Sequence, residues 1–85
     1  MDRKPLNIRP LNAPRPVRVV EAADGAPASI NGRQVARVVD RWRIDDEWWR
    51  ENPISRMYYE VELADGRKWT GFRDLIGGGW YEQRP

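Results

Sequence analysis

The sequence predicts an all-β fold, a small and strongly bent antiparallel sheet or SH3-like barrel of five to six strands. One short helical turn and a basic, proline-rich N-terminal arm complete the expected architecture. Three turn dipeptides separate short apolar runs: Asp24-Gly25, Asn31-Gly32 and Asp65-Gly66. Five Trp, three Tyr and one Phe can fill the small core that 85 residues allow. The chain is therefore predicted to form a single domain over residues 17–85, preceded by the arm.

The arm, residues 1–16, is predicted to be flexible and extended. Four prolines restrict its backbone: Pro5, Pro10, Pro14 and Pro16. Up to Arg18, five basic residues stand against Asp2 alone. A solvated leader and an electrostatic contact with nucleic acid or an acidic partner are both open interpretations. Because Leu6, Ile8 and Leu11 are apolar, the arm is also able to lie along its own domain as an extra strand.

Six strands follow from the turn signals and the alternation of apolar residues: Val17–Ala22, Ala28–Ile30, Arg33–Ile44, Ser55–Leu63, Lys68–Phe72 and Trp80–Gln83. A strand as long as the third usually bends or carries a bulge, and Asp40 is the expected place for it. The flexible turn before the last strand is assigned to Gly77-Gly78-Gly79.

Alternation assigns the faces of the two longest strands. In the fourth strand Met57, Tyr59, Val61 and Leu63 are expected to point inward. The third strand is expected to place Ala36, Val38, Trp42 and Ile44 on one face and Val35, Arg37, Val39, Arg41 and Arg43 on the other. One face would be core and the other basic.

The helical turn is predicted over Asp45–Asn52. Asp45 would cap it, Asp46 and Glu47 suit the positive end of a helix, and Pro53 would stop it. The same acids invite a metal-site interpretation, but one short acidic run does not converge several oxygens on a cation.

Composition argues against catalysis. The chain has no Cys and no His, so disulfides, thiolate metal sites and the usual general base are excluded. We expect no enzyme activity, no cofactor and no metal; a small hydrolase using Asp45, Asp46 or Glu47 is the minor alternative. No apolar run approaches the length of a membrane span, and no signal-type stretch is present, so the cytoplasm is the expected location.

The expected binding surface is the region rich in Trp and Arg. Its candidate residues are Arg37, Arg41, Arg43, Trp48, Trp49, Arg50 and Tyr58. Adjacent indoles leave a regular strand on opposite faces, so one of Trp48 and Trp49 needs a second surface to cover it. Arginines with aromatic faces are typical of binders of single-stranded nucleic acid. The same residues are enriched at protein interfaces, and the strand arginines could instead pair across strands with Glu60 and Glu62.

Several short segments together are similar to a known family. They are Asp40-Arg41-Trp42-Arg43, Trp48-Trp49-Arg50, Ile54-Ser55-Arg56, Tyr58-Tyr59-Glu60-Val61, Phe72-Arg73-Asp74-Leu75 and Gly79-Trp80-Tyr81. The combination resembles a small domain of unknown function at the C-terminal end of ImuB-like Y-family DNA polymerases, also found as short free-standing bacterial proteins. The resemblance covers about residues 17–84. It implies a role in damage-tolerant DNA synthesis (translesion synthesis), beside an error-prone replicative polymerase and a RecA-like protein.

The resemblance and the residues together predict a non-catalytic accessory binding module. It would contact nucleic acid, single-stranded DNA above all, and/or a protein of a polymerase complex. Because the chain lacks a polymerase palm, a catalytic carboxylate set and a clamp-binding peptide, any such role would be that of a separate subunit. The alternative is a pure protein–protein adaptor that never touches nucleic acid. No membrane or small-molecule partner is expected, and an exposed strand edge would allow a homodimer.

Overall fold

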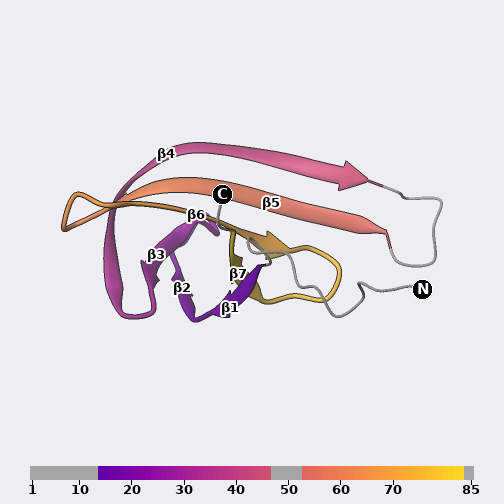
Figure 1. Ribbon diagram of the computed structural model, residues 1–85, viewed down its shortest axis with the longest axis horizontal. Helices are drawn as coiled ribbons and strands as arrows, with labels where there is room; N and C mark the ends of the chain where they lie inside the picture. The colour runs from indigo at the N-terminus through magenta and orange to yellow at the C-terminus, as the bar shows by residue number, and fades with distance from the viewer. Residues whose placement is uncertain (1–13, 47–52, 84–85) are drawn as a thin grey trace, which may run out of the picture.

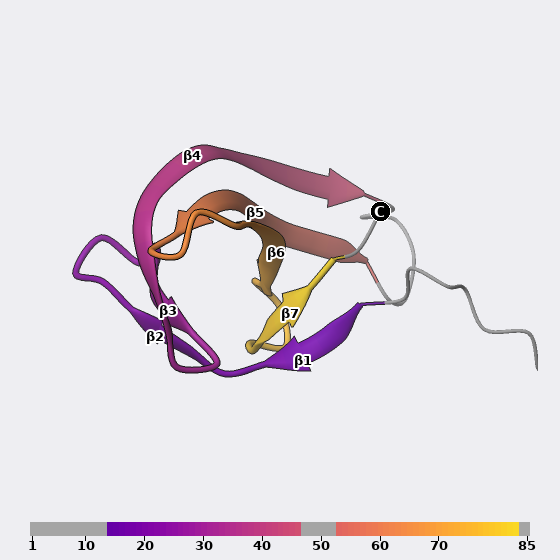
Figure 2. The same cartoon turned by 60° about the vertical axis from the view of Figure 1, so that its left-hand side comes forward.

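Seven antiparallel strands form the fold in a computed structural model that describes residues 14–46 and 53–83. The strands are β1 (Arg15–Val17), β2 (Val19–Glu21), β3 (Pro27–Ile30), β4 (Arg33–Asp46), β5 (Ile54–Leu63), β6 (Lys68–Asp74) and β7 (Trp80–Glu82) (Figure 1). Their order in the sheet is β1-β7-β6-β5-β4-β3-β2. The two outermost strands, β1 and β2, follow one another in the chain, so the sheet curls into a nearly closed barrel (Figure 2). The predicted all-β, SH3-like barrel is confirmed.

The barrel closes at Arg18, where the predicted strand Val17–Ala22 is divided. On one side of this residue β1 pairs with β7, and on the other side β2 pairs with β3. Asn31 holds the corner, since its Oδ1 accepts the Arg18 N–H at 2.9 Å and its own N–H donates to the Arg18 carbonyl at 2.7 Å. The strand therefore changes partners there, which adds a seventh strand to the six predicted. The barrel also includes Arg15 and Pro16, the last two residues of the predicted arm; residues 1–13 lie outside the described part.

All three predicted hairpin turns are confirmed. Asn31 and Gly32 have φ values of 51° and 83°, as a two-residue type I′ turn between β3 and β4 requires. In the other two turns an Asp side chain accepts a backbone N–H two residues on, from Ala26 to Asp24 and from Arg67 to Asp65. Local chemistry is sufficient to fix these turns, which explains why the sequence alone locates them.

The core lies on the inner face of the curved sheet. Its buried residues are Ala26, Ile30, Tyr59, Val61, Leu63, Trp69 and Trp80, and Met57 packs against them as a partly buried residue. The predicted inward face of β5 is thus confirmed. Because the cluster draws on β3, β5, β6 and β7, the curvature of the sheet itself encloses the core.

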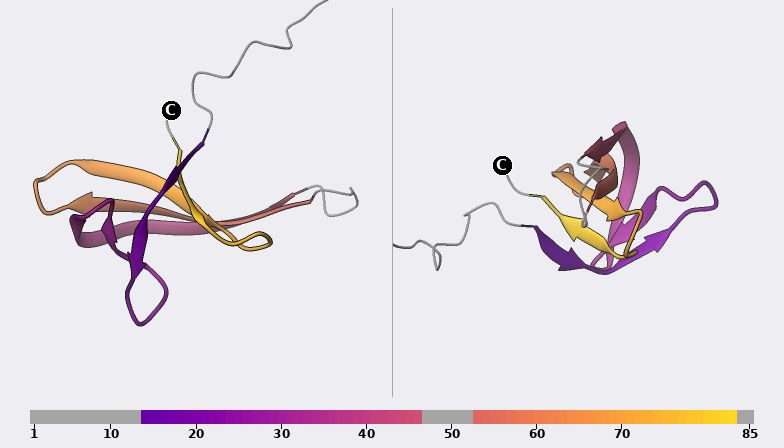
Figure 3. Two further views of the ribbon diagram at one scale, coloured as in Figure 1. Left: turned by 90° about the horizontal axis from the view of Figure 1, so that it is seen from below. Right: turned by 90° about the vertical axis from the view of Figure 1, so that its right-hand side faces the viewer.

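β4 and β5 form a long hairpin that extends well past the barrel (Figure 3). Register shifts occur between Val35 and Arg37 and between Val38 and Asp40, so β4 carries two bulges, at Ala36 and Val39. The sequence predicts one bulge near Asp40, and the second observed bulge lies one residue before it, at Val39. Each bulge moves the following side chains to the other face, and the predicted division of β4 into two faces is wrong as a result.

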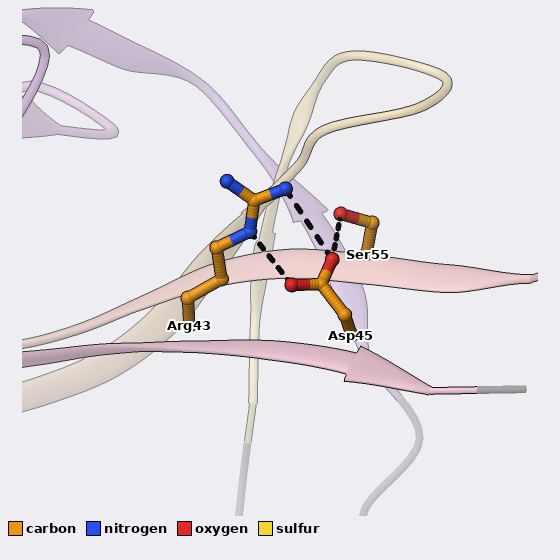
Figure 4. A network of polar contacts seen from close by, with 3 residues as sticks. All are labelled: Arg43, Asp45 and Ser55. Atoms are coloured by element: carbon orange, nitrogen blue, oxygen red, sulfur yellow. Dashed lines mark hydrogen bonds and ion pairs between the residues drawn. The ribbon is translucent and has the colours of Figure 1, made fainter. Parts of the chain in front are cut away.

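The prediction that Asp45 caps a helical turn is also wrong. Asp45 and Asp46 are the last residues of β4, and the described segments contain no helix. Asp45 instead accepts hydrogen bonds from Ser55 Oγ at 2.6 Å and from Arg43 Nε at 2.9 Å (Figure 4). The rest of the predicted turn, residues 47–52, lies outside the described part of the chain.

Candidate nucleic-acid and partner interface

The structure describes four of the seven predicted contact residues and separates them. Across the β4–β5 ladder Arg41 lies opposite Tyr59 and Arg43 opposite Met57, on the face that continues the core. Arg37 lies opposite Glu62, on the other face. Trp48, Trp49 and Arg50 are outside the described residues. The predicted single surface of Arg37, Arg41 and Arg43 is therefore not formed.

Two of these arginines are already neutralised. Arg37 Nε lies 2.8 Å from Glu62 Oε1, which confirms the cross-strand pair considered from the sequence. Arg43 Nε instead contacts Asp45 Oδ2 at 2.9 Å, along its own strand. Arg41 forms no ion pair with any residue of the described segments. Only Arg41 of the three is left as an available cation.

The end of the hairpin is organised around Asp45. The Ser55 hydroxyl and then the Arg43 guanidinium hold the pKa of the Asp45 carboxyl below its usual value, because both stabilise the ionised form (Figure 4). The carboxylate is thus committed to binding its neighbours. A role as a hydrolytic base would require a raised pKa, so this environment does not favour that alternative.

Tyr58, which was expected to offer an exposed aromatic ring, is buried. It is 9% exposed and belongs to a row of aromatic rings on the outer face, with one ring from each of four neighbouring strands. We call this row the aromatic ladder: Trp42, Tyr58, Phe72 and Tyr81. The centroid separations are 5.4 Å for Trp42–Tyr58, 5.0 Å for Tyr58–Phe72 and 5.4 Å for Phe72–Tyr81.

Arg56 covers the middle of the ladder. Its guanidinium carbon lies 4.2 Å from the centroid of Phe72, and its Nη1 donates a hydrogen bond to Tyr58 Oη at 3.1 Å. Phe72 is only 2% exposed as a result, whereas Trp42 at the end of the row is 38% exposed. Within the ladder, Trp42 is the ring best placed to meet a ligand.

A second group of cations, which sequence analysis missed, surrounds a depression at one end of the barrel. We call it the cationic hollow; it has a volume of about 430 Å³. Its described lining residues are Ile30, Asn31, Arg33, Leu63, Arg67, Lys68, Trp69 and Glu82. The β3–β4 and β5–β6 turns meet at this end because β4 and β5 are antiparallel. The sequence signal that could have located the hollow is a basic residue directly after two of the three turn dipeptides, in Asn31-Gly32-Arg33 and Asp65-Gly66-Arg67.

Two cations of the hollow form no ion pair within the described segments, namely Arg33 and Lys68. Arg67, by contrast, is paired with Asp65 at 3.2 Å. The Arg67 backbone N–H, more than its guanidinium, lowers the pKa of the Asp65 carboxyl, and the charge of Arg33 adds a smaller effect from farther away. The indole Nε1 of Trp69, another lining residue, is buried and is not accessible from the hollow. Glu82 is the one carboxylate among the described lining residues, so Arg33 and Lys68 leave the hollow with an excess of positive charge for an anionic group.

No group of three or more Asp or Glu side chains in ranges 14–46 and 53–83 could hold a metal ion. A search of the same residues for a helix long and apolar enough to cross a membrane found none.

Comparison of the chain with protein-family models, with curated proteins and with solved structures found no match. The resemblance to the ImuB-associated domain rests on the sequence segments alone.

Proposed function

We propose that this protein is a non-catalytic accessory module that binds the phosphate backbone of nucleic acid through the cationic hollow. The observation that supports this function is the pair of cations, Arg33 and Lys68, that line one depression without an ion-pair partner in the described segments. Backbone phosphates supply most of the affinity in sequence-independent binding, and Lys and Arg are the residues that neutralise them.

The surroundings of the hollow indicate contact with the backbone and little reading of bases. Tyr58 is buried in the aromatic ladder, and Trp69 is only 9% exposed, so neither offers a free ring face for stacking. Binding should consequently weaken as the salt concentration rises, and it should tolerate changes of base sequence. The resemblance to the ImuB-associated domain supports damage-tolerant DNA synthesis in bacteria as the setting.

The test is a titration of labelled single-stranded and duplex DNA, followed by fluorescence anisotropy at two salt concentrations. The double variant Arg33→Glu/Lys68→Glu should weaken binding at least about tenfold and make the salt dependence shallower, by about one counterion for each lost contact. Arg41→Glu, one charge reversal on the protruding hairpin, is the matched control for the single reversals Arg33→Glu and Lys68→Glu, and it should bind as the wild type does.

The result that would contradict the proposal is unchanged affinity in a folded double variant. Far-ultraviolet circular dichroism and the urea midpoint of both variants establish that each is folded. A loss of binding confined to Arg41→Glu would move the contact from the hollow to the hairpin.

A pure protein adaptor is the second candidate function, and one observation favours it. Trp42 and Ile44 are 38% and 40% exposed beside one another on the outer face of the protruding hairpin. Trp is enriched among residues that dominate protein interfaces. In this alternative the chain docks on a Y-family polymerase, an error-prone polymerase or a RecA-like protein. Trp42→Ala should then reduce capture of the purified partner, whereas Arg33→Glu/Lys68→Glu should not.

A further inference from the structure

One edge of β4 is unpaired over most of its length. β3 pairs with β4 only at Ser29–Gln34 and Ile30–Arg33. From Val35 to Asp46, β5 lies along one side of β4, and no strand of the described segments lies along the other. An edge of this length exposes backbone donors and acceptors that can pair with another chain. Figure 1 shows β4 along the upper edge of the molecule, with β5 below it.

The backbone hydrogen bonds that β5 makes on its β6 side show which residues of β4 direct their backbone N–H and C=O groups to that open edge. Leu63 donates to the Arg67 carbonyl and Leu75 donates to the Ser55 carbonyl, so the odd-numbered residues of β5 bond toward β6. The even-numbered residues of β5 therefore bond toward β4.

Trp42 and Ile44 lie opposite the even-numbered Tyr58 and Arg56, so their backbone groups face β5. Those of Arg41, Arg43 and Asp45 face the open edge. The Arg41 N–H confirms this direction, because it turns away from β5 to the Asp40 side chain, with Oδ1 at 2.8 Å. Arg43 and Asp45 are the positions whose donors no described residue uses.

We propose that two copies of this chain join their β4 edges as antiparallel strands, with the Ile44 residues on the two-fold axis. In this register Arg43 of one copy and Asp45 of the other form a hydrogen-bonded pair, and symmetry repeats it. The Arg41 N–H keeps its bond to Asp40, which ends the shared ladder on that side. Both backbone and side chains fit this arrangement.

The side chains of the three central pairs, formed by residues 43 to 45 of the two copies, are complementary on both faces. On one face Arg43 lies opposite Asp45 of the second copy, so opposite charges meet twice. On the other face the two Ile44 side chains meet, and Trp42 lies diagonally from Ile44 of the second copy, within reach of an aromatic ring. The aromatic ladder would thus continue toward the second molecule, covering the exposed Trp42 and Ile44.

Charge selects this register from its neighbours. A shift by one step toward Arg41 pairs Arg41 with Asp45, but it places Arg43 opposite Arg43 and needs the Arg41 N–H, which is already bonded to Asp40. A further step places Arg43 opposite Arg41. A shift in the other direction places Asp45 opposite Asp45. Like charges opposite one another are unfavourable. The register centred on Ile44 is the one among these four that pairs Arg43 with Asp45, and this self-complementarity identifies a second copy as the occupant.

The test uses the full chain in sedimentation equilibrium from about 10 μM to about 1 mM, where modest interfaces associate. The wild type should show a monomer–dimer equilibrium. Arg43→Asp and Asp45→Arg should each weaken it at least about tenfold, because each brings like charges together twice. An equimolar mixture of the two variants should recover dimer. In the mixed dimer the introduced aspartate of one variant meets the introduced arginine of the other, and the remaining native Asp45 meets the remaining native Arg43.

Recovery in the mixture is decisive because each variant also loses the ion pair within its own β4, and mixing cannot restore that. Ile44→Lys should likewise abolish dimer, whereas its matched control Ile76→Lys, in the β6–β7 loop, should not. A wild type that remains monomeric over the whole range would overturn the proposal. A mixture as monomeric as the single variants would do the same, and pairing with another protein or another segment would then be the use of this edge.

Discussion

Among the glycines of the described residues, Gly71 is the one at which a side chain would overlap the core. It lies on the inner face of β6, opposite Tyr59, where the six-membered ring of Trp69 covers it. A Cβ built there would overlap that ring and the backbone oxygen of Tyr81. The absence of a side chain at Gly71 is therefore what allows Trp69 to lie flat in so thin a barrel.

Gly71→Ala is expected to lower the free energy of unfolding by about 1 to 3 kcal/mol, because neither the buried indole nor the backbone oxygen can move without cost. Urea denaturation followed by tryptophan fluorescence measures the loss. Gly77→Ala is the control, since a Cβ there would lie 3.5 Å from Asp74 Oδ2, an ordinary contact. Equal stability of the two variants would show that the overlap is relieved by a small shift of the ring.

The Asp74 carboxylate organises the loop that contains this control position. It accepts the N–H groups of Ile76 at 2.9 Å and Gly77 at 3.1 Å. These two bonds, and to a smaller degree the charge of Arg56, lower the pKa of Asp74. A carboxyl with a depressed pKa stabilises the fold above its unfolded pKa, and the contribution disappears as the pH falls through the folded value. Asp74 thus contributes at neutral pH and not in acid.

Among the elements, the aromatic ladder gives the outer face of the sheet a second apolar cluster. One ring from each of β4, β5, β6 and β7 takes part, and the burial of each ring depends on its neighbours. Phe72 has a ring on each side and Arg56 above it, whereas Trp42 has a ring on one side only. Removing the Phe72 ring should therefore lower the free energy of unfolding more than removing the Trp42 ring.

Phe72→Ala should accordingly destabilise the protein by about 3 to 5 kcal/mol, the usual range for a fully buried Phe. Trp42→Ala should cost less than half as much, because its indole is already 38% exposed. Chemical denaturation of both variants gives the two values. If Trp42→Ala costs as much as Phe72→Ala, the ladder is a cooperative unit in which the terminal ring is as important as the middle ones.

The elements also show which parts of the fold were predictable. Turns such as Asn31-Gly32 were predicted correctly because their chemistry is local, and β5 was predicted correctly because its alternation is unbroken. The faces of β4 were not, because the bulges at Ala36 and Val39 depend on the pairing with β5. Each extra residue inverts the faces that follow, which separates Arg37 from Arg41 and Arg43. The bulges thus remove the predicted common face of the three arginines, although each of these residues lies in the predicted strand.

The candidate site residues were hard to predict for the same reason, as Tyr58 and the cationic hollow show. Alternation correctly placed Tyr58 on the outer face of β5, but not the two rings that bury it, since these come from β4 and β6. Arg33 and Lys68 are distant in the sequence and meet only because two hairpin turns share one end of the barrel. The burial of Tyr58 and the proximity of Arg33 to Lys68 both depend on contacts between strands. A local sequence pattern does not reveal such contacts.

At the scale of the whole molecule, stability depends on how the curled sheet is closed. Two sets of polar contacts join its ends. Asn31 fastens Arg18 through two hydrogen bonds. On the inner side, Glu21 of β2 accepts the Trp80 indole N–H at 3.0 Å and lies 3.7 Å from Arg73. The second set joins β2 to β6 and β7, which are not its neighbours in the strand order.

The Asn31 contact can be tested without disturbing the turn. Asn31→Gly tolerates the φ of 51° but removes the Oδ1 acceptor, so the Arg18 N–H must turn to water and the free energy of unfolding should fall by about 1 kcal/mol. Asn31→Asp keeps an acceptor and also tolerates a positive φ, and it should remain close to the wild type. Amide hydrogen exchange at Arg18 provides the local measurement: exchange should accelerate in Asn31→Gly and stay slow in Asn31→Asp. If both variants protect this amide equally, the corner is held by the Asn31 backbone bond and the barrel core, and the side chain has no part in closure.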